Sequence, residues 1–154
     1  MTVEQPKEME ALRRWIGTWK ADYLVRFPDG KVHEGTMTVL ATPMAAGQGI
    51  HMDAKGEARG MEPWEAHALW GFDTESREVH WFAVSSMGEV HDHVGVWKDE
   101  DTLELEWRGV EGSEKAVEHT TFHWKNPREV EMRTVNTVGG QQGHTIEGTW
   151  RKRE

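Results

Sequence analysis

The side chains best suited to chemistry are one carboxylate and two imidazoles, Asp92, His119 and His123, in segments where apolar and polar residues otherwise alternate. The strand pairing predicted below turns all three towards a cavity lined with tryptophan. A carboxylate in such surroundings ionises with difficulty unless it is hydrogen-bonded or paired, and an imidazole is a suitable partner. The pair would either orient an otherwise apolar ligand or act as acid and base in a proton transfer. A hydrogen-bond network that satisfies only its own members is the plainer alternative.

The stretch His91-Asp92-His93 raises the separate question of a metal site. Two histidines at positions i and i+2 of a strand point the same way and are able to hold Zn²⁺ or Ni²⁺. The predicted pairing places His91 and His93 on the solvent side, next to glutamates of the following strand and to His80 across the hairpin. A solvated face is therefore preferred to a metal site. This preference depends on the assigned face, because a shift of one residue in the strand pairing turns every side chain of the strand to the opposite face.

Composition bounds the class of protein. The 154 residues suit a single domain, 1–154, that buries a core without disulfides or metals. Eighteen basic against 27 acidic residues give a net charge of −9, so nucleic acid and anionic membranes are poor partners. The absence of cysteine excludes disulfides, thiolate metal sites and a cysteine nucleophile. Residues 1–10 lack the apolar stretch of a signal peptide, and no run nears the roughly 20 apolar residues of a membrane span, so a cytoplasmic protein is expected.

One short helix and about ten strands are predicted. Met9, Leu12 and Ile16 recur at near-helical spacing, which predicts a helix over about 6–15. After it, apolar and polar residues alternate between turn signals, and no segment is long enough for a crossover helix. The chain is therefore predicted to be all-β and to form an up-and-down antiparallel β-barrel over about 17–152, which leaves no strand edge exposed. The predicted strands are 18–27, 32–40, 49–54, 64–72, 78–86, 89–97, 102–108, 116–125, 129–137 and 144–152.

Turn lengths assign the two faces of each strand. A two-residue turn at 87–88 pairs Trp81 with Val94, and pairing across 126–127 sets His119 beside Thr134. Nine tryptophans need either a wide core or a ligand cavity. The predicted inner face consists of Trp19, Tyr23, Phe27, Met37, Met52, Trp64, Trp70, Trp81, Val94, Leu105, Trp107, Met132, Ile146 and Trp150. The predicted outer face holds the charged residues Glu104, Glu106, Glu118, Glu129, Glu131 and Arg133.

The two ends of the predicted barrel carry a family motif. The first strand opens with IGTWKADY after the short helix, and the last strand is HTIEGTWRKRE. This pattern resembles the calycin barrels, which include lipocalins and fatty-acid-binding proteins. In calycins the Trp of the Gly-x-Trp motif plugs the closed end and packs against a basic residue of the last strand, which implies Trp19 as the plug and Arg151 as its partner. The stretches LRRWIGTWKADY and LWGFDTESREVHWF further resemble a bacterial family of unknown function with a lipocalin-like fold.

Two calycin branches bear on the ligand. Fatty-acid-binding proteins insert a helical pair where only the turn at Pro28 follows the first strand, and their Arg-x-Tyr carboxylate clamp is missing here. A fatty acid is therefore not favoured. Nitrobindins hold haem in a similar barrel but carry a more Gly-rich opening motif than GTWKADY. Haem stays an alternative without support from a motif, and no cofactor is predicted.

The combined prediction favours a carrier over an enzyme, with a small, largely apolar, aromatic or planar molecule bound in the barrel. Its ligand contacts are predicted to be Tyr23, Met37, Met52, Trp70, Trp81, Asp92, Trp107, His119, His123 and Met132. One alternative is an isomerase, cyclase or hydrolase that uses Asp92 and His119 as acid and base. The other is a haem protein with His119 or His123 as the axial ligand. The oligomeric state is left open by the sequence.

Overall fold

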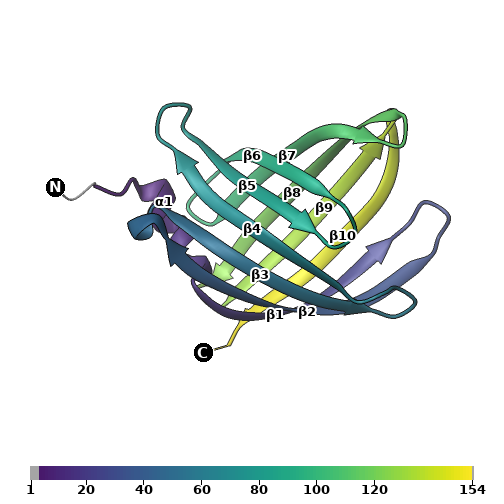
Figure 1. The fold of residues 1–154 in the computed structure, drawn as a ribbon, viewed down its shortest axis with the longest axis horizontal. Coiled ribbons are helices and arrows are strands. Elements are labelled where there is room, and N and C mark those ends of the chain that lie inside the picture. Colours follow the sequence, from purple (N-terminus) through teal and green to yellow (C-terminus); the bar gives the residue numbers. More distant parts are fainter. Residues whose placement is uncertain (1–3, 154) are drawn as a thin grey trace.

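Ten strands form a closed antiparallel barrel in the computed structural model, which describes residues 4–153 (Figure 1). Each strand pairs with its neighbours in sequence and β1 also pairs with β10, which confirms the predicted up-and-down barrel. Residues 1–3 and 154 of the predicted domain lie outside the described residues. The strands are β1 (Gly17–Arg26), β2 (Val32–Met44), β3 (Gly49–Ala58), β4 (Trp64–Asp73), β5 (Glu78–Ser85), β6 (Val90–Trp97), β7 (Thr102–Glu111), β8 (Glu114–Asn126), β9 (Glu129–Val138) and β10 (Gln141–Lys152), with a short turn η2 (Ala45–Gly47) between β2 and β3.

The predicted N-terminal helix is present as α1 (Lys7–Leu12) and the 3-10 turn η1 (Arg13–Trp15), and it lies at one end of the barrel (Figure 1). Met9, Leu12 and Trp15 recur every three residues and are fully buried against the barrel. The helix therefore covers this end. Among residues 4–153, no helix combines the length and the apolar character needed to cross a bilayer.

Aromatic rings fill the barrel beneath α1. The Trp15 ring lies within 5.7 Å of five other rings, and all six side chains are at most 4% exposed. These five neighbours are Trp19, Trp70, Phe122, Trp124 and Trp150. Tilted and edge-to-face arrangements of this kind add to the free energy gained from burying the rings themselves. This end of the barrel is therefore solid.

Trp19 is buried at the closed end, where its Nε1 donates to the Trp15 carbonyl oxygen at 2.7 Å. The basic residue against it is Lys152, whose Nζ lies 5.1 Å from the centre of the Trp19 ring and donates to the Arg14 carbonyl oxygen at 2.9 Å. Trp19 is paired with Lys152 across β1 and β10, so the neighbouring Arg151 points outwards into solvent. The prediction of Arg151 as the partner was wrong by one residue.

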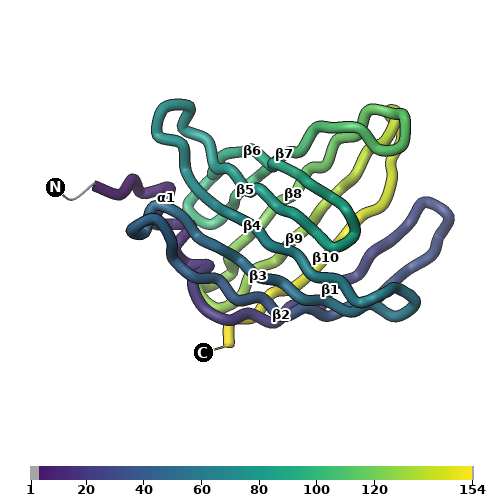
Figure 2. The backbone as a smooth tube through the Cα atoms, in the orientation of Figure 1, coloured from purple at the N-terminus to yellow at the C-terminus, as the bar shows by residue number. Residues whose placement is uncertain are grey.

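The half of the barrel away from α1 is open. Tyr23, Trp64, Ala83, Trp107 and Met132 point inwards but remain only half-buried. A side chain that faces the interior keeps contact with solvent only where that interior is not filled. The hairpin turns at this end, which join β1 to β2, β5 to β6 and β7 to β8, spread apart from one another (Figure 2). The barrel is thus packed at one end and open at the other.

Three strand pairings differ from the prediction by one residue, each for a local backbone reason. The β5–β6 loop has three residues (86–88) instead of two, because the Ser85 N–H donates to the Glu89 carbonyl oxygen. The β6–β7 loop has three residues (99–101) instead of four, because the Lys98 N–H donates to the Thr102 carbonyl oxygen. In the β8–β9 hairpin a bulge between Trp124 and Asn126 shifts the pairing. The β4–β5 pairing is off by two residues, which keeps the faces, and the β1–β2 pairing is confirmed.

The changed loops invert the faces of β6. Trp81 is paired with His93 and not with Val94. His91 and His93 therefore point into the barrel, whereas Asp92 and Val94 lie on its outer surface. The predictions of a lumenal Asp92 and Val94 and of a solvent-facing His91 and His93 were wrong.

The bulge inverts the faces of β8 in the same way. Thr120, and not His119, is paired with Thr134, and the two threonine hydroxyls are hydrogen-bonded at 2.9 Å inside the barrel. His119 and His123 are exposed on the outer surface. Glu118, predicted to face solvent, points inwards. Both predictions for the histidines and the one for the glutamate were wrong for this reason.

Candidate functional site

Seven of the ten predicted ligand contacts face the barrel interior, which is where the prediction put them. They are Tyr23, Met37, Met52, Trp70, Trp81, Trp107 and Met132. Their participation in ligand binding stays a prediction.

The other three predicted contacts lie on the outer surface and are paired there. Asp92 Oδ1 is 3.4 Å from His80 Nδ1, and His119 Nδ1 is 3.4 Å from Glu106 Oε2. The predicted acid–base pair of Asp92 and His119 is therefore wrong, since the two side chains belong to separate surface pairs. His119 and His123 point away from the interior and are not placed to ligate a haem held there.

The interior instead holds a cluster of His91 and His93 from β6 and Glu118 from β8. His93 Nε2 lies 3.4 Å from Glu118 Oε1, and His91 Nδ1 lies 3.9 Å from the same oxygen. The side chains are 13%, 4% and 13% exposed for His91, His93 and Glu118. Two imidazoles and a carboxylate are thus gathered in a place shielded from bulk water.

Indole rings hold the two imidazoles in place. The His93 ring is stacked on Trp81 with centroids 4.1 Å apart, and the His91 ring on Trp107 at 3.7 Å. Trp81 is in turn stacked on the buried Trp70 at 5.1 Å. The cluster is therefore continuous with the aromatic core of the closed end.

The cluster lies where β6 and β7 separate. The ladder between these strands joins only residues 94–97 to 103–106. His91, His93 and Trp107 lie beyond its end, on the side of the open mouth. The stack of His91 on Trp107 spans the two strands at this point, so side chains close the wall where the main-chain ladder stops.

Burial and the interactions among the three side chains shift the pKa values of Glu118 and His91. Burial raises the pKa of Glu118, but the hydrogen bond from His93 and the attraction of His91, His93 and His144 in their protonated forms outweigh it and leave the pKa below its usual range. Burial lowers the pKa of His91, and the attraction of Glu118 only partly opposes this. At neutral pH the cluster therefore contains an ionised carboxylate beside a neutral His91.

A buried amide next to the cluster has no partner. Asn136 is paired with Glu118 across β8 and β9 and is 1% exposed. Within the described residues neither polar atom of its side chain has a hydrogen-bond partner, and the same holds for Trp81 Nε1. Buried polar groups are nearly always satisfied in folded proteins, so these atoms indicate places for a ligand or for water.

Glu118 is the site residue that sequence reasoning missed, although a signal for it exists. Phe122 and Trp124 share its phase in the alternation of β8, at i+4 and i+6. Two large apolar residues in phase mark the buried face, and Glu118 lies on that face. The expectation that a glutamate must face solvent outweighed this pattern.

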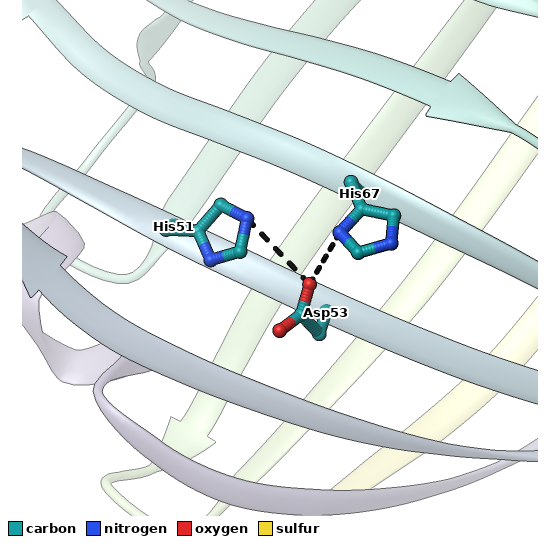
Figure 3. Close-up of side chains that lie close together, drawn as sticks. All are labelled: His51, Asp53 and His67. Atoms are coloured by element: carbon teal, nitrogen blue, oxygen red, sulfur yellow. Dashed lines mark ion pairs between the residues drawn. The ribbon is translucent and has the colours of Figure 1, made fainter.

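A second cluster lies on the outer surface of β3 and β4. His67 Nδ1 is 2.5 Å and His51 Nε2 3.5 Å from the same oxygen of Asp53, so both rings converge on one carboxylate (Figure 3). The side chains are 37% exposed for His51, 40% for Asp53 and 59% for His67. This group resembles the inner cluster in composition but is open to solvent.

A groove of about 1840 Å³ crosses the outer face of the barrel. Its walls include the outward-facing carboxylates of Asp22, Glu34, Glu131 and Glu147. The residues of the inner cluster do not line it. Its lining also includes Tyr23, Met132 and Gly148 from the open half of the barrel, so the groove reaches the mouth.

Comparison with known proteins bears on the fold. No protein-family model matches the chain, and no curated protein matches it. Among solved structures the chain is similar to Rv2717c from M. tuberculosis, with a TM-score of 0.74 and 13% identity over 98% of this chain and 100% of the other. It is also similar to the S-type phycobiliprotein lyase CPES from Guillardia theta, with a TM-score of 0.66 and 13% identity over 98% and 99% of the two chains.

A third similar structure is that of EF1p2_mFAP2b bound to DFHBI, with a TM-score of 0.52 and 10% identity over 95% of this chain and 99% of the other. At such identities the similarity shows a shared fold alone. The closed barrel fold is shared with these structures, whereas membership of the calycins stays a prediction from the motifs.

Proposed function

We propose that the protein binds a small, planar, largely apolar molecule in the open half of the barrel. The observation that carries the proposal is the half-exposure of inward-facing rings, among them Trp64 and Trp107. A planar ligand placed against these rings removes their remaining apolar surface from water, at about 25 cal/mol for each Å². Small inward-facing residues such as Ala83 and Gly148 leave room for it.

The polar groups of the open half favour a particular kind of ligand. The ionised Glu118 accepts hydrogen bonds, and the unpartnered Asn136 amide both donates and accepts them. Tyr23 accepts a hydrogen bond from Trp64 Nε1 at 2.9 Å and keeps its own proton to donate. A ligand with a donor group or a positive charge at one end suits this lining, whereas a carboxylate would be repelled by Glu118.

The similar structures support the use of the interior. One of them is bound to DFHBI, and another is a phycobiliprotein lyase by name. These two proteins of similar fold therefore hold or act on other molecules by name, and the open half described above is the space that this chain offers to a small molecule.

The test uses N-phenyl-1-naphthylamine, a neutral planar amine whose fluorescence rises when it leaves water. The protein is titrated with this probe in the presence of EDTA, and saturable binding is expected. Ala83→Trp fills the interior and is expected to weaken binding at least tenfold. Val84→Trp is the matched control, because Val84 is the next residue of β5 and is 43% exposed on the outer surface.

Circular dichroism of both variants checks that the barrel is intact. Loss of binding in Ala83→Trp with retention in Val84→Trp supports the proposal. No saturable binding to the unchanged protein, or equal binding to both variants, contradicts it.

A further inference from the structure

We propose that His91, His93 and Glu118 form a binding site for a divalent transition-metal ion of the Zn²⁺ type inside the barrel. Two imidazole nitrogens and one carboxylate oxygen are a ligand set that Zn²⁺ uses in sites that keep a fourth position open. The ligand atoms of the three residues all lie within 4.8 Å of one another. This inference goes beyond the proposed ligand binding and does not depend on it.

The distances within the cluster suit a tetrahedral ion. Bonds of about 2.0–2.1 Å at tetrahedral angles place ligand atoms roughly 3.3 Å apart. His93 Nε2 and Glu118 Oε1 are already 3.4 Å apart, and His91 Nδ1 is 3.9 Å from that oxygen. Small rotations of the side chains therefore complete the set, without movement of the strands.

The surroundings of His93 orient it as a ligand. Its Nδ1 lies 3.2 Å from the main-chain carbonyl oxygen of Trp81, to which it donates, so Nε2, the atom that faces Glu118, is the nitrogen that gives up its proton when a metal ion binds. A hydrogen bond from the second ring nitrogen to a carbonyl is the usual support of a metal-binding histidine, since it fixes both tautomer and ring orientation. The stack on Trp81 restrains the same ring from the side.

Charge and burial also favour a cation here. The cluster places one carboxylate beside two imidazoles whose side chains are 13% and 4% exposed, so an ion bound there would be shielded from bulk water. Asn136, whose buried amide has no partner among the described residues, is the neighbour of Glu118 across the β8–β9 ladder. It is placed to bond to a water or to a ligand group in the open coordination position.

The outer cluster of His51, Asp53 and His67 provides an internal control. It offers the same kinds of ligand atom within 4.8 Å (Figure 3), but its side chains are much more exposed to solvent. A comparison of variants in the two clusters therefore separates a site built inside the barrel from weak chelation by surface histidines.

The experiment titrates EDTA-treated and dialysed protein with Co²⁺, whose visible absorption is strong only in tetrahedral sites, and then displaces it with Zn²⁺. One tight site is expected. Loss of one ligand, in His93→Gln or Glu118→Gln, is expected to weaken binding by more than about 100-fold, the upper range for changes to merely supporting residues. His51→Gln and His67→Gln are expected to leave this site unchanged.

A spectroscopic measurement on the unchanged protein covers the case in which a variant does not fold. Imidazole proton–nitrogen NMR spectra recorded with and without Zn²⁺ are expected to shift the signals of His91 and His93 first. Absence of tight binding, or first shifts at His51 and His67, overturns the inference. Binding of the naphthylamine probe is measured in EDTA, so a failure of the metal site leaves that result standing, and the reverse also holds.

Discussion

His93 is held by Trp81 in two ways, with its ring stacked on the indole at 4.1 Å and its Nδ1 hydrogen-bonded to the Trp81 main-chain carbonyl at 3.2 Å. Both contacts cross the β5–β6 ladder, where the two residues are directly paired. The three-residue loop at 86–88 sets this pairing. The two histidines therefore owe their inward position to the length of this loop, since a loop one residue shorter would turn both outwards, whereas Glu118 owes its position to the bulge in the β8–β9 hairpin.

The burial of His91 makes stability depend on pH. Burial lowers the pKa of His91, so on acidification the unfolded chain takes up a proton before the folded one does. The stability contributed by neutral His91 is complete above the ordinary histidine pKa of about 6.5, and it is lost as the pH falls towards the folded-state pKa. We expect His91→Phe to reduce the decline of the unfolding free energy below that pH.

Urea unfolding followed by tryptophan fluorescence, at several pH values on either side of 6.5, measures this effect. One proton limits the change in slope to about 1.4 kcal/mol for each pH unit. Val84→Phe, at an exposed residue of β5 that carries no titrating group, is the control and is expected to leave the slope as it is. Equal slopes for His91→Phe and the unchanged protein would contradict the assignment.

The closed end predicts different roles for two neighbouring basic residues. Lys152 lies over the Trp19 ring and donates to a main-chain carbonyl, whereas Arg151 forms only exposed ion pairs. We expect Lys152→Ala to lower the unfolding free energy by about 1–2 kcal/mol, from the lost cation–π contact and hydrogen bond. Arg151→Ala is expected to change it by less than about 0.5 kcal/mol. Denaturant titration measures the unfolding free energy of both variants. A larger loss in Arg151→Ala than in Lys152→Ala would show that Arg151 is the partner of Trp19.

The fold was predictable because its signals are local and repeated. Turn residues recur between alternating segments, and the Gly-x-Trp motif at Trp19 identified the closed end, so element type and order needed no long-range information. The face of β6 was not predictable in this way. Val90, Val94 and Val96 are in phase with Asp92, so periodicity alone turns the valines inwards. In the structure these valines lie on the outer face, with Val90 57% and Val96 45% exposed.

The close approach of β6 to β7 makes a further prediction. Gly95 is paired with Leu105, and a Cβ at residue 95 would lie 1.8 Å from the Glu104 carbonyl oxygen, which is backbone and cannot move aside. We expect Gly95→Ala to cost about 3 kcal/mol of stability, as overpacking does at sites without freedom to relax. Gly71→Ala is the matched control, because its Cβ would meet only one atom, at 3.9 Å. Thermal unfolding monitored by circular dichroism compares the stability of the two variants. If both lose the same stability, β6 and β7 can move apart at residue 95 without strain, and the prediction is wrong.

A hydrogen bond from Trp64 Nε1 to the Tyr23 hydroxyl, 2.9 Å long and partly buried, lies at the mouth of the barrel. We expect Tyr23→Phe and Trp64→Phe each to lower the unfolding free energy, and the double variant to lower it by about 1 kcal/mol less than the sum of the two. The reason is that either change alone already removes the bond. Urea unfolding of the four proteins completes this cycle, and strictly additive losses would mean that the two side chains act independently.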